Sequence, residues 1–243
     1  MKKFEIKIHN GPGRLGKLED IETPNIALIT SSEIAKDEPA PYDIQKEIAT
    51  WSVRSTIKKA KDDVREIGVI QGGKYLDLRV ESAKELEKIG YNGFLIANGD
   101  DLLLHPKDLV DIVINLRQNI SPNNYLIFPF AEPSFIPLLC YMGIDGFLNK
   151  SAEYYAHLNV LMTATKNYDL NEYKIYDLSY KELKISNENT LDFVLREVRE
   201  HMKNGTLRNL VEERSLTSPQ NVSTLKLLDK KYQDYLQKYT ELY

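Results

Sequence analysis

A possible contact site for a flat ligand follows the apolar run at residues 68–70, in the stretch GVIQGGKYLDLR. Gln71 offers an acceptor and donors, so its side chain can recognise the edge of a planar amide or a nucleobase. Gly72 and Gly73 let the backbone approach such a ligand closely, but paired glycines also suit a plain tight turn. These three residues alone leave both interpretations open, and the turn is the more common one.

An acidic pair, Asp100-Asp101, follows a second apolar run. Two neighbouring carboxylates can bind a metal or act as acid and base, but such a pair more often caps a helix or faces solvent, which we favour. A zinc site needs four nitrogen or sulfur ligands, or three and a water. His105, His157 and His201 have no partner at such spacing, and no phosphate-binding or dinucleotide-binding motif occurs. We therefore predict no metal site and no cofactor.

The composition is that of a soluble globular protein. Of 243 residues, 42% are hydrophobic and 28% are charged. There is no run of about 18 apolar residues and no apolar signal core at the N-terminus, so we predict a cytoplasmic protein without a membrane partner. Cys140 is the only cysteine, and its apolar neighbours favour a buried thiol. The net charge of −4 gives no basic surplus, so contact with RNA would depend mainly on a partner.

Short apolar runs alternate with segments of helical spacing along the first two thirds of the chain. Residues 4–8 and 14–19 flank the turn HNGPG and predict a hairpin, and another apolar run covers 26–29. Strands are expected at 67–70, 94–97, 125–128 and 144–148, and helices at about 43–64, 76–89, 106–116 and 133–142. This order favours a parallel sheet covered on both faces, either Rossmann-like or barrel-like.

The character of the sequence changes after about residue 163. Residues 167–186 are polar and rich in tyrosine. Amphipathic segments at 190–203, 206–214 and 219–239 predict three helices. The tyrosines can stack on bases, but packing against a partner protein explains them equally well.

Several segments, in the same order along the chain, resemble the tRNA-guanine transglycosylases, especially the archaeal branch and the transglycosylase-like part of archaeosine synthase. The most specific match is GVIQGGKYLDLRVESAKEL. The segment DEPAPYD at 37–43 resembles an Asp-Glu-Cys-x-Pro-Tyr motif, with Pro39 in place of the cysteine. The other matching segments are GRLGKLEDIETPNIALIT, GYNGFLIAN, MGIDGFLNK and the C-terminal helices from GTLRNLVEERS onward.

The sequence departs from this family at its catalytic positions. In the family the last barrel strand ends in Phe-Asp, and that aspartate attacks the ribose. Here Phe147 is followed by Leu148, which cannot form a covalent intermediate. The loop with a second catalytic aspartate is missing between Ser31 and Asp37, and the zinc-binding cysteines and histidine are also missing. The resemblance therefore implies no catalytic residue and no base exchange.

A partial set of base-reading residues remains. By resemblance, Asp37 and Gln71 would hydrogen-bond the edge of a guanine-like base, and Gly72 and Gly73 would line the pocket. The family's later pair of glycines is replaced by Ala97-Asn98, so Asn98 would form an altered wall. Asp37 and Gln71 can equally persist as supports of the fold.

The resemblance implies an α/β fold with an incomplete TIM-barrel-like parallel core, an N-terminal β-hairpin and a C-terminal helical region. A complete barrel takes about 250 residues, whereas residues 26–162 supply only five or six strands. We expect residues 1–165 to form the partial barrel with its hairpin and residues 166–243 to form a helical region packed on it. The exposed strand edges would need covering by these helices, by a smaller closed barrel or by a second chain.

The favoured function is that of a non-catalytic, transglycosylase-like subunit of a heteromeric archaeosine synthase complex in tRNA modification. The resemblance implies lysine transfer to a 7-cyano-7-deazaguanine base in the tRNA D-loop, with a radical SAM enzyme acting afterwards. The expected partners are a core-bearing subunit, into which larger relatives continue beyond the position of Tyr243, and tRNA bound mainly through it. One alternative is a structural partner of an active transglycosylase. Another is an independent small-molecule enzyme that uses Asp100, Asp101 or Glu132.

Overall fold

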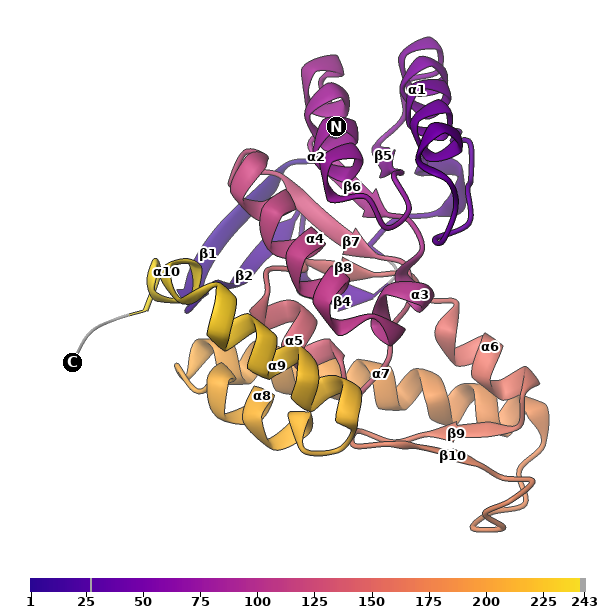
Figure 1. Cartoon of the computed structure of the whole chain (residues 1–243). Helices are drawn as coiled ribbons and strands as arrows, with labels where there is room; N and C mark the ends of the chain where they lie inside the picture. The colour runs from indigo at the N-terminus through magenta and orange to yellow at the C-terminus, as the bar shows by residue number, and fades with distance from the viewer. Residues whose placement is uncertain (27, 241–243) are drawn as a thin grey trace.

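A five-stranded parallel sheet forms the centre of the molecule (Figure 1). The computed structural model describes residues 1–26 and 28–240. The spatial order of the strands is β4-β8-β7-β6-β5, and every neighbouring pair is parallel. The strands predicted at 67–70, 94–97, 125–128 and 144–148 are thus confirmed, although β8 is short. Of the apolar run at 26–29, only residue 26 lies in β4, and residue 27 lies outside the described residues. The bounds are Asn25–Ile26 for β4, Ile67–Ile70 for β5, Gly93–Ile96 for β6, Tyr125–Phe128 for β7 and Gly146–Phe147 for β8.

Helices connect the parallel strands, as the alternating pattern predicts. Gly90, with a φ of +112°, ends α2, and Pro106 occupies the first turn of α4. The helix predicted at 133–142 is shorter, because only its second half is α-helical. The bounds are Lys46–Asp62 for α1, Leu76–Ile89 for α2, Gly99–Leu104 for α3, Pro106–Asn119 for α4, Ile136–Tyr141 for α5 and Ser151–His157 for α6.

The face that α1 buries differs from the apolar positions that suggested this helix. Ile48 and Trp51 are 44% and 57% exposed. The buried face consists of small or short side chains, which allow α1 to lie close to β5 and α2. These residues are Ala49, Ser52, Val53, Thr56 and Ala60. The periodicity predicted the helix correctly, but close packing by small residues decided its orientation.

The two faces of the sheet pack against different layers. Residues that point to one face, such as Phe94 and Phe128, belong to the main core together with α2 and α4. Residues of the opposite face, such as Val69 and Ile127, pack under Leu18 of the N-terminal sheet. This antiparallel sheet confirms the predicted hairpin. Its strands are β1 (Phe4–Asn10), β2 (Gly13–Leu18) and β3 (Ile21–Thr23), in that spatial order.

The sheet does not close into a barrel, in agreement with the predicted incomplete TIM-like core. The first strand, β4, pairs with the last, β8, while β5 at the other edge pairs only with β6. An isolated parallel bridge between Ile34 and Ile67 covers part of the β5 edge. On the β4 side, the helix over Tyr180–Lys203, α7, packs against the strand, and Arg199 donates to the Pro24 carbonyl at 2.6 Å. The β4 edge is therefore covered, and the β5 edge partly covered, within this chain.

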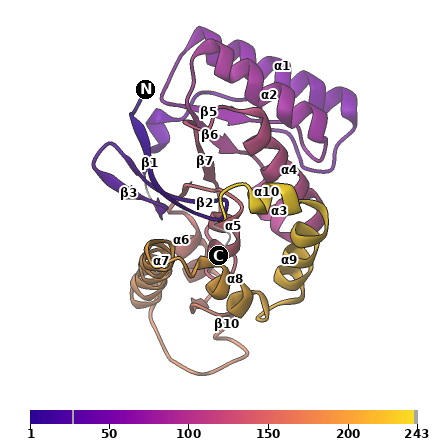
Figure 2. The same cartoon turned by 90° about the vertical axis from the view of Figure 1, so that its left-hand side faces the viewer.

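The C-terminal region lies on the side of the molecule away from α1 and α2 (Figures 1 and 2). A capping box of Ser179 and Glu182 starts α7 ten residues before the predicted position 190. The single helix predicted at 219–239 is interrupted at Tyr232. The elements are β9 (Val160–Met162), β10 (Asn167–Asp169), α7, α8 (Leu207–Ser215), α9 (Pro219–Lys231) and α10 (Gln233–Gln237). Among the described residues, no helix has both the length and the apolarity needed to cross a membrane.

Candidate functional site

The carboxyl ends of the parallel strands bring four chain segments to one edge of the sheet. Gln71 follows β5, Asn98 follows β6 after one residue, Pro129 follows β7 and Leu148 follows β8. In open α/β sheets and in (β/α) barrels, ligands bind at this edge. The structure therefore places the candidate base-binding residues where the fold class predicts a site.

Gln71 and Asp37 lie in direct contact at this edge. The Gln71 side chain is only 2% exposed, and its Nε2 donates to Oδ2 of Asp37 at 2.7 Å. Its other polar atom, Oε1, is buried and has no hydrogen-bond partner within the described chain. An unpaired buried acceptor costs about 1–3 kcal/mol, so the free protein keeps an acceptor ready for a donor.

The glycine turn after Gln71 is explained by close approach of the backbone. Gly73 has a φ of +55°, and a Cβ there would lie 2.8 Å from the Tyr42 carbonyl oxygen. Gly72 has a φ of +142°, and a Cβ there would lie 2.9 Å from the Arg79 backbone nitrogen. Both missing side chains thus face protein backbone, and the tight turn alone accounts for the two glycines. Contact between this turn and a ligand stays a prediction.

Arg79 holds this edge together, and the sequence analysis missed it. The side chain is fully buried on the inner face of α2. It donates from Nε to the Gly73 carbonyl at 2.8 Å, from Nη1 to the Ile70 carbonyl at 2.8 Å and from Nη2 to Oδ1 of Asn98 at 3.1 Å. Burial lowers the Arg79 pKa to about 10. The signal in the sequence was an arginine at helical spacing from Ala83 and Leu86, on the apolar face of α2.

Asn98, one of the five predicted base-binding residues, forms hydrogen bonds that stabilise the fold. It has a φ of +60°, accepts from Arg79 and donates from Nδ2 to the Ala40 carbonyl at 3.0 Å. These bonds link the end of β6 to α2 and to the segment that carries Asp37. Asn98 therefore positions the edge, and its contact with a base stays a prediction.

An apolar residue stands at the end of β8. Leu148 is partly buried against the cluster that contains Val69 and Leu95. Gln71 continues the alternation of Ile67 and Val69 along β5, so it points to this same face of the sheet. The end of β8 thus presents a leucine, and no carboxylate, to the face on which Gln71 lies.

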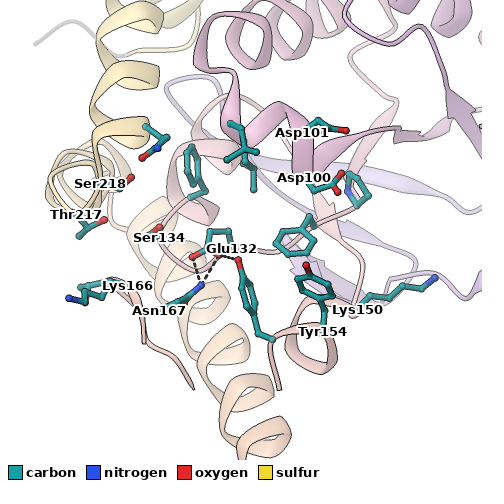
Figure 3. Close-up of a pocket in the computed structure, with 18 residues that line it drawn as sticks. Asp100, Asp101, Glu132, Ser134, Lys150, Tyr154, Lys166, Asn167, Thr217 and Ser218 are labelled. Atoms are coloured by element: carbon teal, nitrogen blue, oxygen red, sulfur yellow. Dashed lines mark hydrogen bonds between the residues drawn. The ribbon is translucent and has the colours of Figure 1, made fainter. Parts of the chain in front are cut away.

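A cavity lies beside the predicted set. It has a volume of about 740 Å³ and lies beyond the ends of the central strands (Figure 3). Its walls come from α3, the loop after β7, α6, the β9–β10 turn and the connection from α8 to α9. None of the five predicted base-binding residues lines it, and Asp100 is the lining residue nearest to them in sequence. The structure therefore has two candidate sites at one edge of the sheet.

Glu132 is the most enclosed charged residue of this cavity. Tyr155 donates to its Oε2 at 2.9 Å, and Nδ2 of Asn167 donates to Oε2 at 2.9 Å and to Oε1 at 3.1 Å. Burial raises the pKa of Glu132, although the hydrogen bonds from Tyr155 and Asn167 act in the opposite direction. Asp100 is exposed in the first turn of α3, as the sequence predicted. No group of three or more metal-binding side chains gathers in the part of the chain that the structure describes.

Comparison with known proteins shows the family to which this chain belongs. A family model described as queuine tRNA-ribosyltransferase matches residues 31–183. The chain therefore belongs to this transglycosylase family. It is 33% identical to the archaeosine synthase of Methanocaldococcus jannaschii over 181 residues, which are 74% of this chain and 29% of that protein.

Two further relatives are tRNA-guanine(15) transglycosylases. The protein from Methanocaldococcus jannaschii is 27% identical over an aligned length of 279, and the alignment covers 96% of this chain and 42% of the relative. The protein from Thermococcus kodakarensis is 28% identical over an aligned length of 268, and the alignment covers 96% of this chain and 46% of the relative. The chain spans less than half the length of these relatives. The resemblance inferred from the motifs is thereby confirmed.

Proposed function

We propose that this chain is a catalytically altered, transglycosylase-like subunit of an archaeosine synthase complex. The observation that carries the proposal is Leu148 at the end of β8, packed against an apolar cluster. The family's base exchange needs a carboxylate nucleophile at this position, and leucine cannot supply one. In this proposal the complex transfers lysine to the 7-cyano-7-deazaguanine base of tRNA, and this chain contributes no catalytic residue.

The retained pair of Asp37 and Gln71 supports a role in holding the modified base. Oε1 of Gln71 is a buried acceptor without a partner among the described residues, so a ring N–H or an exocyclic amine of a base would satisfy it. Asp37 is partly exposed beside it and offers a second acceptor. The proposed pocket has Gly72 and Gly73 as its turn and Asn98 as its altered wall.

The proposed partners are a core-bearing subunit and, mainly through it, tRNA. A net charge of −4 disfavours extensive contact with phosphates by this chain alone. Ile48 and Trp51 on α1 are apolar and exposed, which suits contact with another protein. In this scheme residues 1–165 form the transglycosylase-like part and residues 166–243 form the helical region, and a radical SAM enzyme acts on the product.

The test is reconstitution with the candidate core-bearing subunit, with incorporation of labelled lysine into tRNA as the readout. We expect co-purification of the two chains and incorporation only when both are present. Asp37→Ala and Gln71→Ala should each reduce incorporation at least about tenfold, as expected for loss of a hydrogen bond that involves a charged or buried group. Asp43→Ala, in the same segment but exposed, is the matched control. Full activity of the core-bearing subunit by itself would disprove the proposal.

A second candidate function is a purely structural partner of an active transglycosylase. It is favoured by the direct hydrogen bond between Gln71 and Asp37, because residues that bind each other can serve the fold alone. In that case both alanine variants keep the normal activity of the reconstituted complex, while omission of the whole chain abolishes that activity. The third candidate, an independent small-molecule enzyme, would use the cavity around Glu132 and would act without any partner.

A further inference from the structure

The cavity around Glu132 has no part in the proposed base site and therefore needs its own explanation. It lies between the ends of the central strands and the C-terminal helices, and about 740 Å³ is enough for a small organic ligand. Figure 3 shows Glu132 near the middle of the lining residues, with dashed bonds to Asn167. Tyr155 also donates to Glu132. The charged and polar groups of this wall decide what kind of ligand fits.

Hydrogen-bond acceptors outnumber donors at the enclosed side of the cavity. Both Glu132 oxygens accept from Nδ2 of Asn167, and Tyr155 gives its only hydroxyl proton to Oε2. Oδ1 of Asn167 is buried next to them and has no partner in residues 1–26 and 28–240. A donor-rich group placed there would satisfy this acceptor and a free lone pair of the carboxylate. An anion or a carbonyl group would add one more acceptor.

Aromatic rings stand beside this carboxylate. Phe130 lies edge-on to Tyr155 and to Tyr154, with ring centroids 5.7 Å and 5.9 Å apart. The faces of such rings carry negative partial charge and attract cations, most strongly where water is excluded. Glu132 forms no ion pair among the described residues, and burial raises its pKa.

The lysines that line the cavity do not neutralise it. Lys150 and Lys166 are exposed, and neither forms an ion pair in the described part of the chain. The Lys166 Nζ instead lies 4.5 Å from the centroid of the Tyr168 ring. Two more carboxylates, Asp100 and Asp101 on α3, line the opposite part of the wall, again without an ion pair among the described residues. The cavity thus has one enclosed and one exposed negative region.

We infer that this cavity binds an aliphatic amine with two or more ammonium groups. One ammonium group binds Glu132 and Oδ1 of Asn167, because an ammonium carries three donors and no acceptor. The apolar chain lies along Phe130 and Leu103, and a second ammonium group lies near Asp100 and Asp101. This site is independent of the proposed role in tRNA modification, because it uses none of the base-holding residues.

Isothermal titration of the full chain with 1,5-diaminopentane tests the inference. The matched uncharged probe is 1,5-pentanediol and the matched anion is glutarate. We expect the diamine to bind at least about tenfold more tightly than the diol, as a charge-assisted hydrogen bond predicts, and glutarate not to bind. Spermidine should bind at least as tightly as the diamine, because the cavity is larger than the shorter amine needs.

Variants then locate the site. Glu132→Gln should weaken diamine binding at least about tenfold, whereas Glu153→Gln, on the exposed side of α6, should leave it unchanged. If Glu132→Gln does not fold, Tyr154→Leu removes an aromatic wall from an exposed position and should weaken binding about threefold to tenfold. Equal affinity for diamine and diol, or unchanged diamine affinity in a folded Glu132→Gln protein, would overturn the inference.

Discussion

Nε2 of Gln71 lies 2.7 Å from Oδ2 of Asp37, and this bond joins the end of β5 to a segment 34 residues earlier in the chain. The bond uses one of the two polar groups of the Gln71 amide and leaves Oε1 buried without a partner in the described residues. An unsatisfied buried acceptor costs about 1–3 kcal/mol, and a ligand that donates to it would recover this free energy. The arrangement therefore favours a ligand that donates to Oε1.

Gln71→Leu separates stability from binding. The substitution removes the bond to Asp37 but also removes the unsatisfied acceptor, so the free energy of unfolding should change by no more than about 1 kcal/mol. Lysine incorporation in the reconstituted complex should fall at least about tenfold, because the base loses its acceptor. Urea unfolding and the incorporation assay measure the two effects. One unsatisfied buried group costs about 1–3 kcal/mol. If Gln71→Leu instead lowers the free energy of unfolding by about 3 kcal/mol or more, the main role of Gln71 is to stabilise the fold.

Arg79→Leu should destabilise the whole carboxyl edge of the sheet. The guanidinium gives hydrogen bonds to two backbone carbonyls and to Asn98, and each bond from a charged donor contributes about 1.5–3 kcal/mol. We expect the free energy of unfolding to fall by about 3 kcal/mol or more, since the carbonyls of Ile70 and Gly73 lose partners. Arg79→Lys should recover only part of the lost free energy of unfolding, because one ammonium group cannot reach all three acceptors. Lys84→Leu, on an exposed position of α2, is the control.

Gly73→Ala and Gly90→Ala form a matched pair. Both glycines have positive φ, +55° and +112°, so both substitutions introduce backbone strain of about 1–2 kcal/mol. A Cβ at Gly90 meets nothing within 4 Å, whereas a Cβ at Gly73 lies 2.8 Å from the Tyr42 carbonyl oxygen. Gly73→Ala should therefore cost about 1–3 kcal/mol more than Gly90→Ala in urea unfolding. Equal costs would show that the loop at residues 72–74 can move away from Tyr42.

The elements of the parallel core were predictable because they depend on local patterns. Four-residue apolar runs between turns define β5, β6 and β7, and Gly90 and Pro106 mark helix ends. The orientation of α1 was not predictable in the same way. Its exposed Trp51 and its buried Ser52 and Thr56 reverse the usual preference, because close approach to β5 and α2 requires small side chains.

The candidate site was only partly predictable, for a different reason. The motif resemblance identified Asp37 and Gln71, which the structure brings into contact. Arg79 escaped notice because its role depends on carbonyl groups, which every residue has and which a sequence pattern does not mark. The sequence analysis named Asp100, Asp101 and Glu132 as candidates for a small-molecule site. It missed Asn167 and Ser218, which reach the same cavity from the C-terminal region through tertiary packing.

Asp145→Ala should be among the most destabilising single substitutions in this chain. Asp145 is fully buried and accepts from both Arg14, at 2.5 Å, and Arg117. It joins β2 of the N-terminal sheet to α4 and to the start of β8. Its removal leaves two buried guanidinium groups without a carboxylate, so we expect a loss of about 3–5 kcal/mol in urea unfolding. Asp192→Ala, which breaks the exposed pair with Arg196 on α7, should cost less than about 1 kcal/mol.

The pH dependence of stability tests the electrostatic state of Glu132. Its folded pKa is raised by burial above the ordinary value of 4.5, so the folded protein binds the proton more tightly than the unfolded chain does. The stability that protonation of Glu132 contributes is complete below pH 4.5 and is lost as the pH rises through the folded pKa. Glu132→Gln should remove this loss, so urea unfolding of the variant should depend less on pH above 4.5 than that of the wild type.

Diamine binding should show the opposite trend with pH, since an ammonium group binds the ionised form of Glu132. Affinity should therefore increase as the pH rises through the folded pKa, while the stability of the free protein decreases. The other titratable groups that line the cavity are Asp100, Asp101, Lys150, Tyr154, Tyr155 and Lys166. Asp100→Asn tests the contribution of the carboxylates on α3. It should lower the affinity for the diamine without removing the dependence of that affinity on pH. A pH trend that persists in Glu132→Gln would place the titrating group elsewhere, whereas its loss in that variant alone would identify Glu132 as the carboxylate that binds the amine.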